Sequence, residues 1–144
     1  MKKLMLAITT ICFMTFCSSP VGPNNENKAQ RLISEYLKRN LNDPESYESI
    51  EFSSIDSLKS IIFYTDEYSH YDKYSKDKSN NLQMRLAYSK LLVQLASQPN
   101  PPKGFSLTHT YRAKNGFGAK MLEKKKFIFN DRIDSIISVL DVKN

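Results

Sequence analysis

The amino-acid sequence predicts an α+β domain, in which an N-terminal helix packs on a roughly four-stranded antiparallel sheet that contains an inserted helical segment. Three observations support this fold class. A length of 144 residues allows one domain. Apolar residues recur at helical spacing in 29–41 and in 84–95, whereas apolar and polar residues alternate in 105–113, as they do in a half-buried strand.

The composition excludes several classes of protein. Hydrophobic residues make up 40% of the chain and aromatic residues 11%, too much for a disordered protein. Both cysteines lie within the first 17 residues, which excludes a disulfide scaffold and a cysteine-rich zinc site. Two histidines are too few for a histidine-rich metal site. We therefore expect neither a metal nor a cofactor.

Residues 1–16 are typical of a secretory signal peptide. Lys2 and Lys3 precede the apolar run Leu4–Phe16. At about 1.5 Å per helical residue, this run is too short for the roughly 30 Å hydrocarbon core of a bilayer. Without the two lysines the formal charge falls from +6 to +4, which is not typical of a nucleic-acid-binding protein.

Cys17 closes the apolar run, and the segment resembles a bacterial lipoprotein signal. The resemblance implies that Cys17 is lipidated, as with palmitate, and becomes the mature N-terminus, anchored stably by several acyl chains. In many Gram-negative lipoproteins an aspartate directly after the lipidated cysteine retains the protein in the inner membrane. Ser18 stands at that position here, so the resemblance implies an outer-membrane location. Phe16 departs from the small residue usual before such a cysteine. Cleavage after Ser19 and lipidation of Cys12 are the alternatives.

Residues 17–27 are expected to form the lipidated cysteine and a flexible tether, because prolines, a glycine and asparagines dominate them. The domain would then occupy 28–144. Its first helix is predicted from Ala29 to Leu41 by apolar spacings of three and four. The helix should end at Asn42-Asp43-Pro44, because a residue before proline is disfavoured in the α region.

The middle of the chain changes pattern twice. Residues 48–65 predict one long bent strand or two short strands, with the β-prone run Ile61–Tyr64 as part of them. Residues 66–98 predict an inserted helical segment, with a firm helix from about Asn80 to Ser97 that the following prolines end. The row of Tyr64, Tyr68, Tyr71 and Tyr74 would pack a short helix on the sheet or, less favoured, form a sugar-stacking or partner-binding face.

The last third predicts a β-meander. Phe105, Leu107, His109, Tyr111 and Ala113 share one face of its first strand. Met121, Phe127 and Phe129 share a face of the second strand, and the third strand is expected in the β-branched run Ile133–Leu140. This order of elements is similar to that of cystatin-like folds, a likeness of layout that implies no function.

Two registers compete for the first hairpin of this meander. Asn115-Gly116 favours a two-residue turn, which would pair Tyr111 with Lys120 and bury lysines against apolar residues. A shift of one residue pairs Tyr111 with Met121 and moves the lysines to the polar face. We predict the shifted register, with His109 opposite Glu123. It leaves Lys125 opposite Leu107, from where its side chain must reach water.

Two short motifs carry a further resemblance. Leu41–Phe52 contains L-x-D-P-x-S-Y-E, and Thr108–Lys120 contains Y-R-A-K-N-x-F-G. Both motifs resemble small Gram-negative envelope lipoproteins of unknown function. The resemblance implies the fold family and an envelope location, and it supplies no catalytic residues.

The candidate binding residues gather around the second motif: Arg112, Lys114, Phe117, Lys120, Lys124 and Lys126. An exposed Phe117 beside cations could anchor a partner, although we favour a bulged hairpin whose phenylalanine returns to the core. The lysines could bind anionic headgroups or acidic glycans, at about 1 kcal/mol per charge near such a surface. We favour lysines that protect a sheet edge from pairing with another chain.

His109 and Glu123 are the candidate acid–base pair, the minimum for proton transfer. No nucleophile motif accompanies them, so no catalytic residue is assigned. The sequence therefore predicts a non-enzymatic binding or structural module of the envelope, with an envelope protein, the cell wall or an anionic glycan as its partner. The alternative is a small hydrolase or isomerase that uses His109. A cavity lined by His109, Tyr111 and an acidic group would favour the enzyme.

Overall fold

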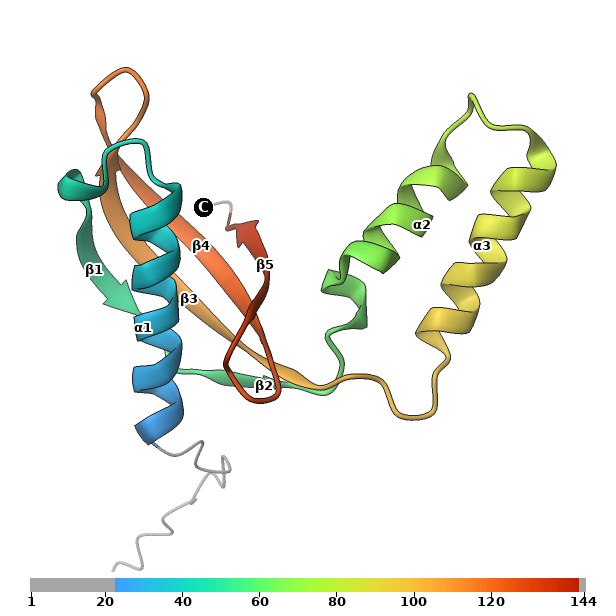
Figure 1. Cartoon of the computed structure of the whole chain (residues 1–144), viewed down its shortest axis with the longest axis horizontal. Coiled ribbons are helices and arrows are strands. Elements are labelled where there is room, and N and C mark those ends of the chain that lie inside the picture. Colours follow the sequence, from blue (N-terminus) through green and yellow to red (C-terminus); the bar gives the residue numbers. More distant parts are fainter. Residues whose placement is uncertain (1–22, 143–144) are drawn as a thin grey trace, which may run out of the picture.

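The computed structural model describes residues 23–142, which form an antiparallel sheet, a helix on one of its faces and a helical hairpin set apart from both (Figure 1). The α+β fold on a sheet confirms the predicted fold class. Two short 3-10 helices, η1 (Pro44–Ser46) and η2 (Ile62–Tyr64), join larger elements. These larger elements are α1 (Pro23–Asn40), β1 (Glu48–Phe52), β2 (Asp56–Leu58), α2 (Asp66–Lys76), α3 (Leu82–Ala96), β3 (Gly104–Lys114), β4 (Lys120–Asn130) and β5 (Ile136–Asp141).

Helix α1 begins at Pro23, so the prediction of a flexible tether through residue 27 is wrong for its last five residues. Proline suits the first turn of a helix, where its missing N–H has no partner to lose, and Glu26 favours the same end of the helix dipole. Tertiary contacts add to this, because the Lys28 ammonium donates to the Arg132 carbonyl at 2.6 Å. Residues 17–22 of the expected tether, and the signal segment, lie outside the described residues.

The sheet has the strand order β1-β3-β4-β5, and β2 continues along the β1 edge of β3. Of the two predicted forms of residues 48–65, the two short strands are therefore correct. The predicted strand over Ile61–Tyr64 is wrong, because η2 replaces most of it. Leu58 already pairs with Gly104, the first residue of β3, so no partner strand is left for the residues that follow.

The core lies between α1 and the sheet. Ala29, Ile33 and Leu37 of α1 are at most 2% exposed. They pack against the face of β3 and β4 formed by Leu107, Tyr111, Ala113, Phe127 and Phe129, with Ile133 from the turn before β5. The predicted alternation in β3 therefore chose the buried face correctly.

The hairpin of β3 and β4 excludes the two-residue turn. Lys114 lies opposite Lys120, which leaves a loop of five residues, 115–119. Each side chain lies on its predicted face, and so Lys120, Lys124 and Lys126 share a face with Arg112. Burial of charge therefore outweighed the turn preference of Asn115-Gly116.

The predicted residue pairs in that hairpin are wrong, because the register of β4 is displaced by two residues from the predicted one. Tyr111 lies opposite Glu123 rather than Met121, and Lys125 lies opposite His109 rather than Leu107. A displacement of two residues leaves the alternation unchanged, so the pattern of apolar residues could not distinguish the two registers.

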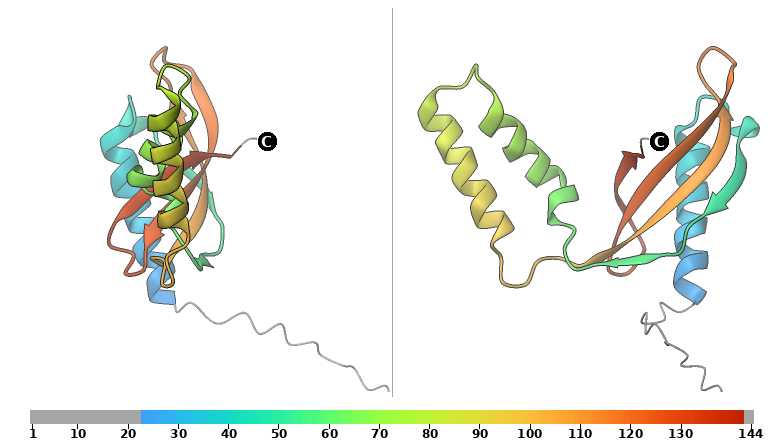
Figure 2. Two further views of the ribbon diagram at one scale, coloured as in Figure 1. Left: turned by 90° about the vertical axis from the view of Figure 1, so that its right-hand side faces the viewer. Right: turned by 180° about the vertical axis from the view of Figure 1, so that it is seen from behind.

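The inserted helical segment is an antiparallel hairpin of α2 and α3, and this part of the prediction is confirmed. Figure 1 and the right-hand view of Figure 2 show that the hairpin stands beside the sheet and does not cover its face. The preferred packing of the tyrosine row on the sheet is wrong. Tyr71 and Tyr74 instead lie against Tyr88 of α3, with ring centroids 6.2 and 5.3 Å apart.

Candidate binding loop

The loop 115–119 is closed by hydrogen bonds from its first residue. The Asn115 N–H donates to the Ala119 carbonyl at 2.9 Å. The Asn115 side-chain oxygen accepts from the N–H groups of Phe117 and Ala119, both at 3.0 Å. Gly118 has a φ of +80°, a left-handed conformation that glycine adopts without strain. The loop is thus built from its own polar groups and needs no burial of its tip.

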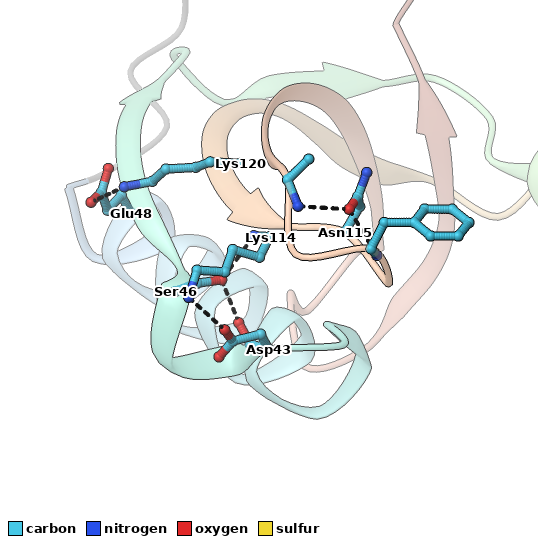
Figure 3. Close-up of polar contacts among 8 residues, drawn as sticks. Asp43, Ser46, Glu48, Lys114, Asn115 and Lys120 are labelled. Carbon is cyan, nitrogen blue, oxygen red and sulfur yellow. Dashed lines mark hydrogen bonds and ion pairs between the residues drawn. The ribbon is translucent and has the colours of Figure 1, made fainter.

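A second set of contacts fastens the base of the loop to the segment that follows α1 (Figure 3). The Ser46 hydroxyl oxygen accepts from the Lys114 N–H at 2.8 Å, and the Lys114 ammonium lies 3.4 Å from the Asp43 carboxylate. At the other end of the loop, Lys120 donates to the Glu48 carboxylate. This hydrogen bond, with the charge of Lys120, lowers the pKa of Glu48.

These contacts bring the two sequence motifs together. Asp43, Ser46 and Glu48 belong to the first motif, whereas Lys114 and Asn115 belong to the second, 68 residues after Ser46. Sequence reasoning assigned no role to Asp43, Ser46 and Glu48. The available signal was the opposite charge of the two motifs, but charge alone does not show which segments meet.

Phe117 stands at the tip of the loop with 98% of its surface exposed, so the preferred prediction that its ring returns to the core is wrong. Met121 and Leu122 at the start of β4 are also exposed, at 48% and 58%. Complete burial of a phenylalanine side chain would be worth about 1.5–3 kcal/mol, which the folded chain forgoes here. The loop therefore presents apolar surface to solvent on a fixed support.

The basic candidates divide into two groups. Lys114 and Lys120 form the ion pairs at the base of the loop. Arg112, Lys124 and Lys126 lie on the sheet face opposite α1, where Lys124 lines a shallow groove with Thr108 and Thr110. The structure thus does not join all six candidates into one cationic site.

The prediction of an edge strand holds for part of the lysine-rich segment. β5 pairs with residues 125–129 of β4. Within the described part of the chain, residues 120–123 have no strand on their outer side, so Lys120 lies on an edge. Lys125 and Lys126 lie where β5 covers β4, and the edge interpretation is wrong for them.

His109 is fully buried, and both ring nitrogens have partners inside the fold. Nδ1 lies 2.9 Å from the Glu51 carbonyl, so it carries the proton and donates. Nε2 accepts from the Tyr47 hydroxyl at 2.8 Å, and the ring stacks on Phe52 with centroids 3.8 Å apart. Burial lowers the pKa of His109, and the ring is held neutral.

Glu123 does not meet His109, so the predicted acid–base pair is absent. The Tyr111 hydroxyl donates to the Glu123 carboxylate at 2.6 Å, and Lys125 lies 3.3 Å from the same carboxylate. Burial and this hydrogen bond raise the pKa of Tyr111. Burial alone would lower the pKa of Lys125, but Glu123 and Asp141 outweigh it and raise that pKa.

A cleft of about 390 Å³ opens between α1 and the sheet beside this group. Tyr111, Glu123 and Lys125 line it together with the C-terminal end of α1, but His109 does not. Among the described residues, no cluster of histidine, cysteine and carboxylate side chains could hold a metal ion. None of the helices in residues 23–142 has the length and apolar character needed to cross a membrane.

Comparison with known proteins does not extend these observations. No family model matches this sequence, and no curated protein and no solved structure is similar enough to count as a match. The resemblance to envelope lipoproteins therefore stays a prediction from two motifs.

Proposed function

We propose that this chain is a lipid-anchored protein of the cell envelope, attached through Cys17, that acts as a non-enzymatic binding module. The observation that carries the binding role is the exposed ring of Phe117 on a loop fastened at both ends. A contact group that is already positioned loses little conformational entropy on binding. Aromatic anchors also supply a large share of the binding energy at protein interfaces.

The surroundings of Phe117 favour a protein as the partner. Met121 and Leu122 add exposed apolar area on opposite faces of the strand that leaves the loop. The exposed ring of Phe117 suits a partner with an apolar pocket, because Lys114 and Lys120 beside it are already neutralised by Asp43 and Glu48. An anionic glycan would need free cations at the same place.

The position of the loop also bears on the proposal. The loop lies beside the C-terminal end of α1, whereas attachment through Cys17 would be at the N-terminal end (Figure 1). The 18 residues of α1 cover about 27 Å, and the six residues from Cys17 to Gly22 reach at most roughly 20 Å. The loop would thus be displayed on the end of the domain opposite the membrane, toward a partner in the aqueous compartment or beyond.

The buried state of His109 supports a binding module over the alternative enzyme. A general base must reach a substrate within hydrogen-bond distance. Both nitrogens of His109 are occupied by Tyr47 and Glu51, and the ring does not line the cleft beside Glu123. The cleft beside Glu123 gives no specific support to hydrolysis or isomerisation.

Site-specific photo-crosslinking in cells that produce the full chain tests the proposal. A benzophenone amino acid at Phe117 should give a discrete crosslinked protein band, and the same group at the exposed Ser54 is the matched control. In the purified complex, Phe117→Ser should weaken binding by about tenfold or more, because aromatic anchors are typically worth at least about 2 kcal/mol.

Three results would count against the proposal. Equal crosslinking from both positions would show that the loop is not the contact surface. Binding that survives Phe117→Ser but is lost on substitution of Lys124 and Lys126 would instead indicate an anionic glycan on the open sheet face. Recovery of the full chain in the soluble fraction would refute the membrane attachment while leaving the role of the loop intact.

A further inference from the structure

The hairpin of α2 and α3 is an independent projection of the fold. Its two helices pack mainly on each other and on η2, and neither helix has a fully buried residue. Contacts of Tyr88 with Tyr71 and Tyr74 hold the helices together, and the Arg85 side chain donates to the Ser75 carbonyl at 3.2 Å. The hairpin is thus well formed, and within residues 23–142 little other than η2 covers it (Figure 2).

Helix α3 is apolar on more than the side that meets α2. Leu82, Leu86 and Val93, which we call the α3 stripe, are 68%, 60% and 66% exposed. Their spacings of four and seven residues place them on one face of the helix. Met84 and Leu91, seven residues apart, add exposed apolar area on another side. A helix with this distribution of apolar residues is typical of one that is buried in an assembly.

The charges argue against the chain's own open sheet face as the cover. Arg85 and Lys90 are the charged residues of α3, and both are cationic. The open sheet face carries Arg112, Lys124 and Lys126, which would repel them. In contrast, the first turn of α2 carries the carboxylates of Asp66 and Glu67, whereas its last turn carries Lys73 and Lys76, and Lys76 forms an ion pair with Asp72.

A second copy of the hairpin offers both an apolar surface and charges of opposite sign. With a two-fold axis perpendicular to the helices, α3 of each copy can lie parallel to α2 of the other, since the two patches are the same on both subunits. Arg85, in the first half of α3, then approaches the carboxylates at the start of the partner's α2, and the two α3 stripes share one apolar interior. Four helices arranged in this way form a four-helix bundle.

The available area agrees with a modest but specific dimer. α3 has 15 residues and is about 22 Å long, and two adjacent helices about 10 Å apart present a face roughly 20 Å wide. Two such faces in contact bury on the order of 1,000 Å² in total, the lower limit for a specific interface.

We propose that the α2–α3 hairpin docks on the same hairpin of a second copy, forming a four-helix bundle around the α3 stripe. This inference is independent of the binding role of Phe117 and of lipid attachment. The test uses residues 18–144, which retain all the core residues and lack cysteine. Sedimentation equilibrium should show a concentration-dependent dimer.

Variants locate the interface. Leu86→Glu with Val93→Glu should raise the dimer dissociation constant about tenfold or more, because charge would be buried among apolar groups. Ile50→Glu with Leu140→Glu is the control, since it changes two exposed apolar residues outside both the hairpin and the Phe117 loop and should leave the constant unchanged. Circular dichroism should show that the helix content is kept.

A spin label gives a second measurement that requires no destabilising charge. Attached at Ala87, an exposed position near the middle of α3 and on another side than the α3 stripe, it should report a distance between copies below about 40 Å, set by the width of a four-helix bundle plus two label linkers. Three results would overturn the proposal: a wild-type monomer at several hundred micromolar, equal loss of dimer in the control, or a spin-label distance beyond this limit. Binding to lipid vesicles that needs the α3 stripe, without self-association, would assign the surface to a bilayer instead.

Discussion

Replacement of His109 by leucine tests whether this residue acts through packing. The substitution leaves the Tyr47 hydroxyl and the Glu51 carbonyl, both in partly buried hydrogen bonds, without their partner, and each group left unsatisfied costs up to about 1–3 kcal/mol. Loss of the ring stacked on Phe52 adds about 0.5–1.5 kcal/mol. Burial of the leucine side chain offsets part of this loss of stability. We expect the free energy of unfolding to fall by about 2–4 kcal/mol.

The cost should depend on pH with a definite sign. Because burial lowers the pKa of His109 in the folded protein, the unfolded chain binds the extra proton first as the pH falls. Wild-type stability should therefore decline below about pH 6.5, by up to about 1.4 kcal/mol per pH unit, until the folded protein also takes up the proton. The leucine variant lacks this decline, so its disadvantage should shrink as the pH falls from 7.5 to 5.5, by at most about 1.4 kcal/mol.

Urea denaturation at these two pH values measures both effects. Tyr47→Phe is the companion variant, since it removes the hydroxyl that His109→Leu leaves unsatisfied. Combined with His109→Leu it should cost less than the sum of the single changes, by a coupling of about 1 kcal/mol. A His109→Leu protein as stable as wild type, or equally destabilised at both pH values, would refute this account.

Three further predictions concern the anchor and two glycines. Cys17→Ala should abolish labelling by a palmitate analogue and release the protein into the soluble envelope fraction; labelling that disappears only with Cys12→Ala would move the lipid to that cysteine. Gly104→Ala should destabilise by about 2 kcal/mol or more in thermal denaturation, because the added Cβ would lie 2.1 Å from the Phe129 carbonyl oxygen, and a normal melting temperature would contradict this. Gly118→Ala should cost about 1–2 kcal/mol through its left-handed φ alone, since nothing lies within 4 Å of its Cβ position, and faster amide exchange in the loop would accompany that cost.

The helices and the faces of the sheet could be predicted from the sequence by itself. Apolar residues at spacings of three and four determine α1 and α3, because that spacing places them on one side of a helix. Alternation in β3 determines that Leu107 and Tyr111 are buried while Lys124 and Lys126 point to the open face. Burying lysines costs more than an unfavourable turn, and this comparison needs no knowledge of the rest of the fold.

The exact register and the candidate loop were decided by tertiary structure. Registers that differ by two residues bury the same faces, so the register depends on contacts outside the hairpin. Ser46 and Asp43 hold Lys114 from a distant part of the chain, and Tyr47 and Glu51 occupy both nitrogens of His109. The local sequence pattern predicts which face of the sheet a side chain lies on. The hydrogen-bond partner of that side chain depends on how segments about 60 residues apart in the sequence are brought together. For that reason the exposure of Phe117 and the separation of His109 from Glu123 could be learned only from the folded chain.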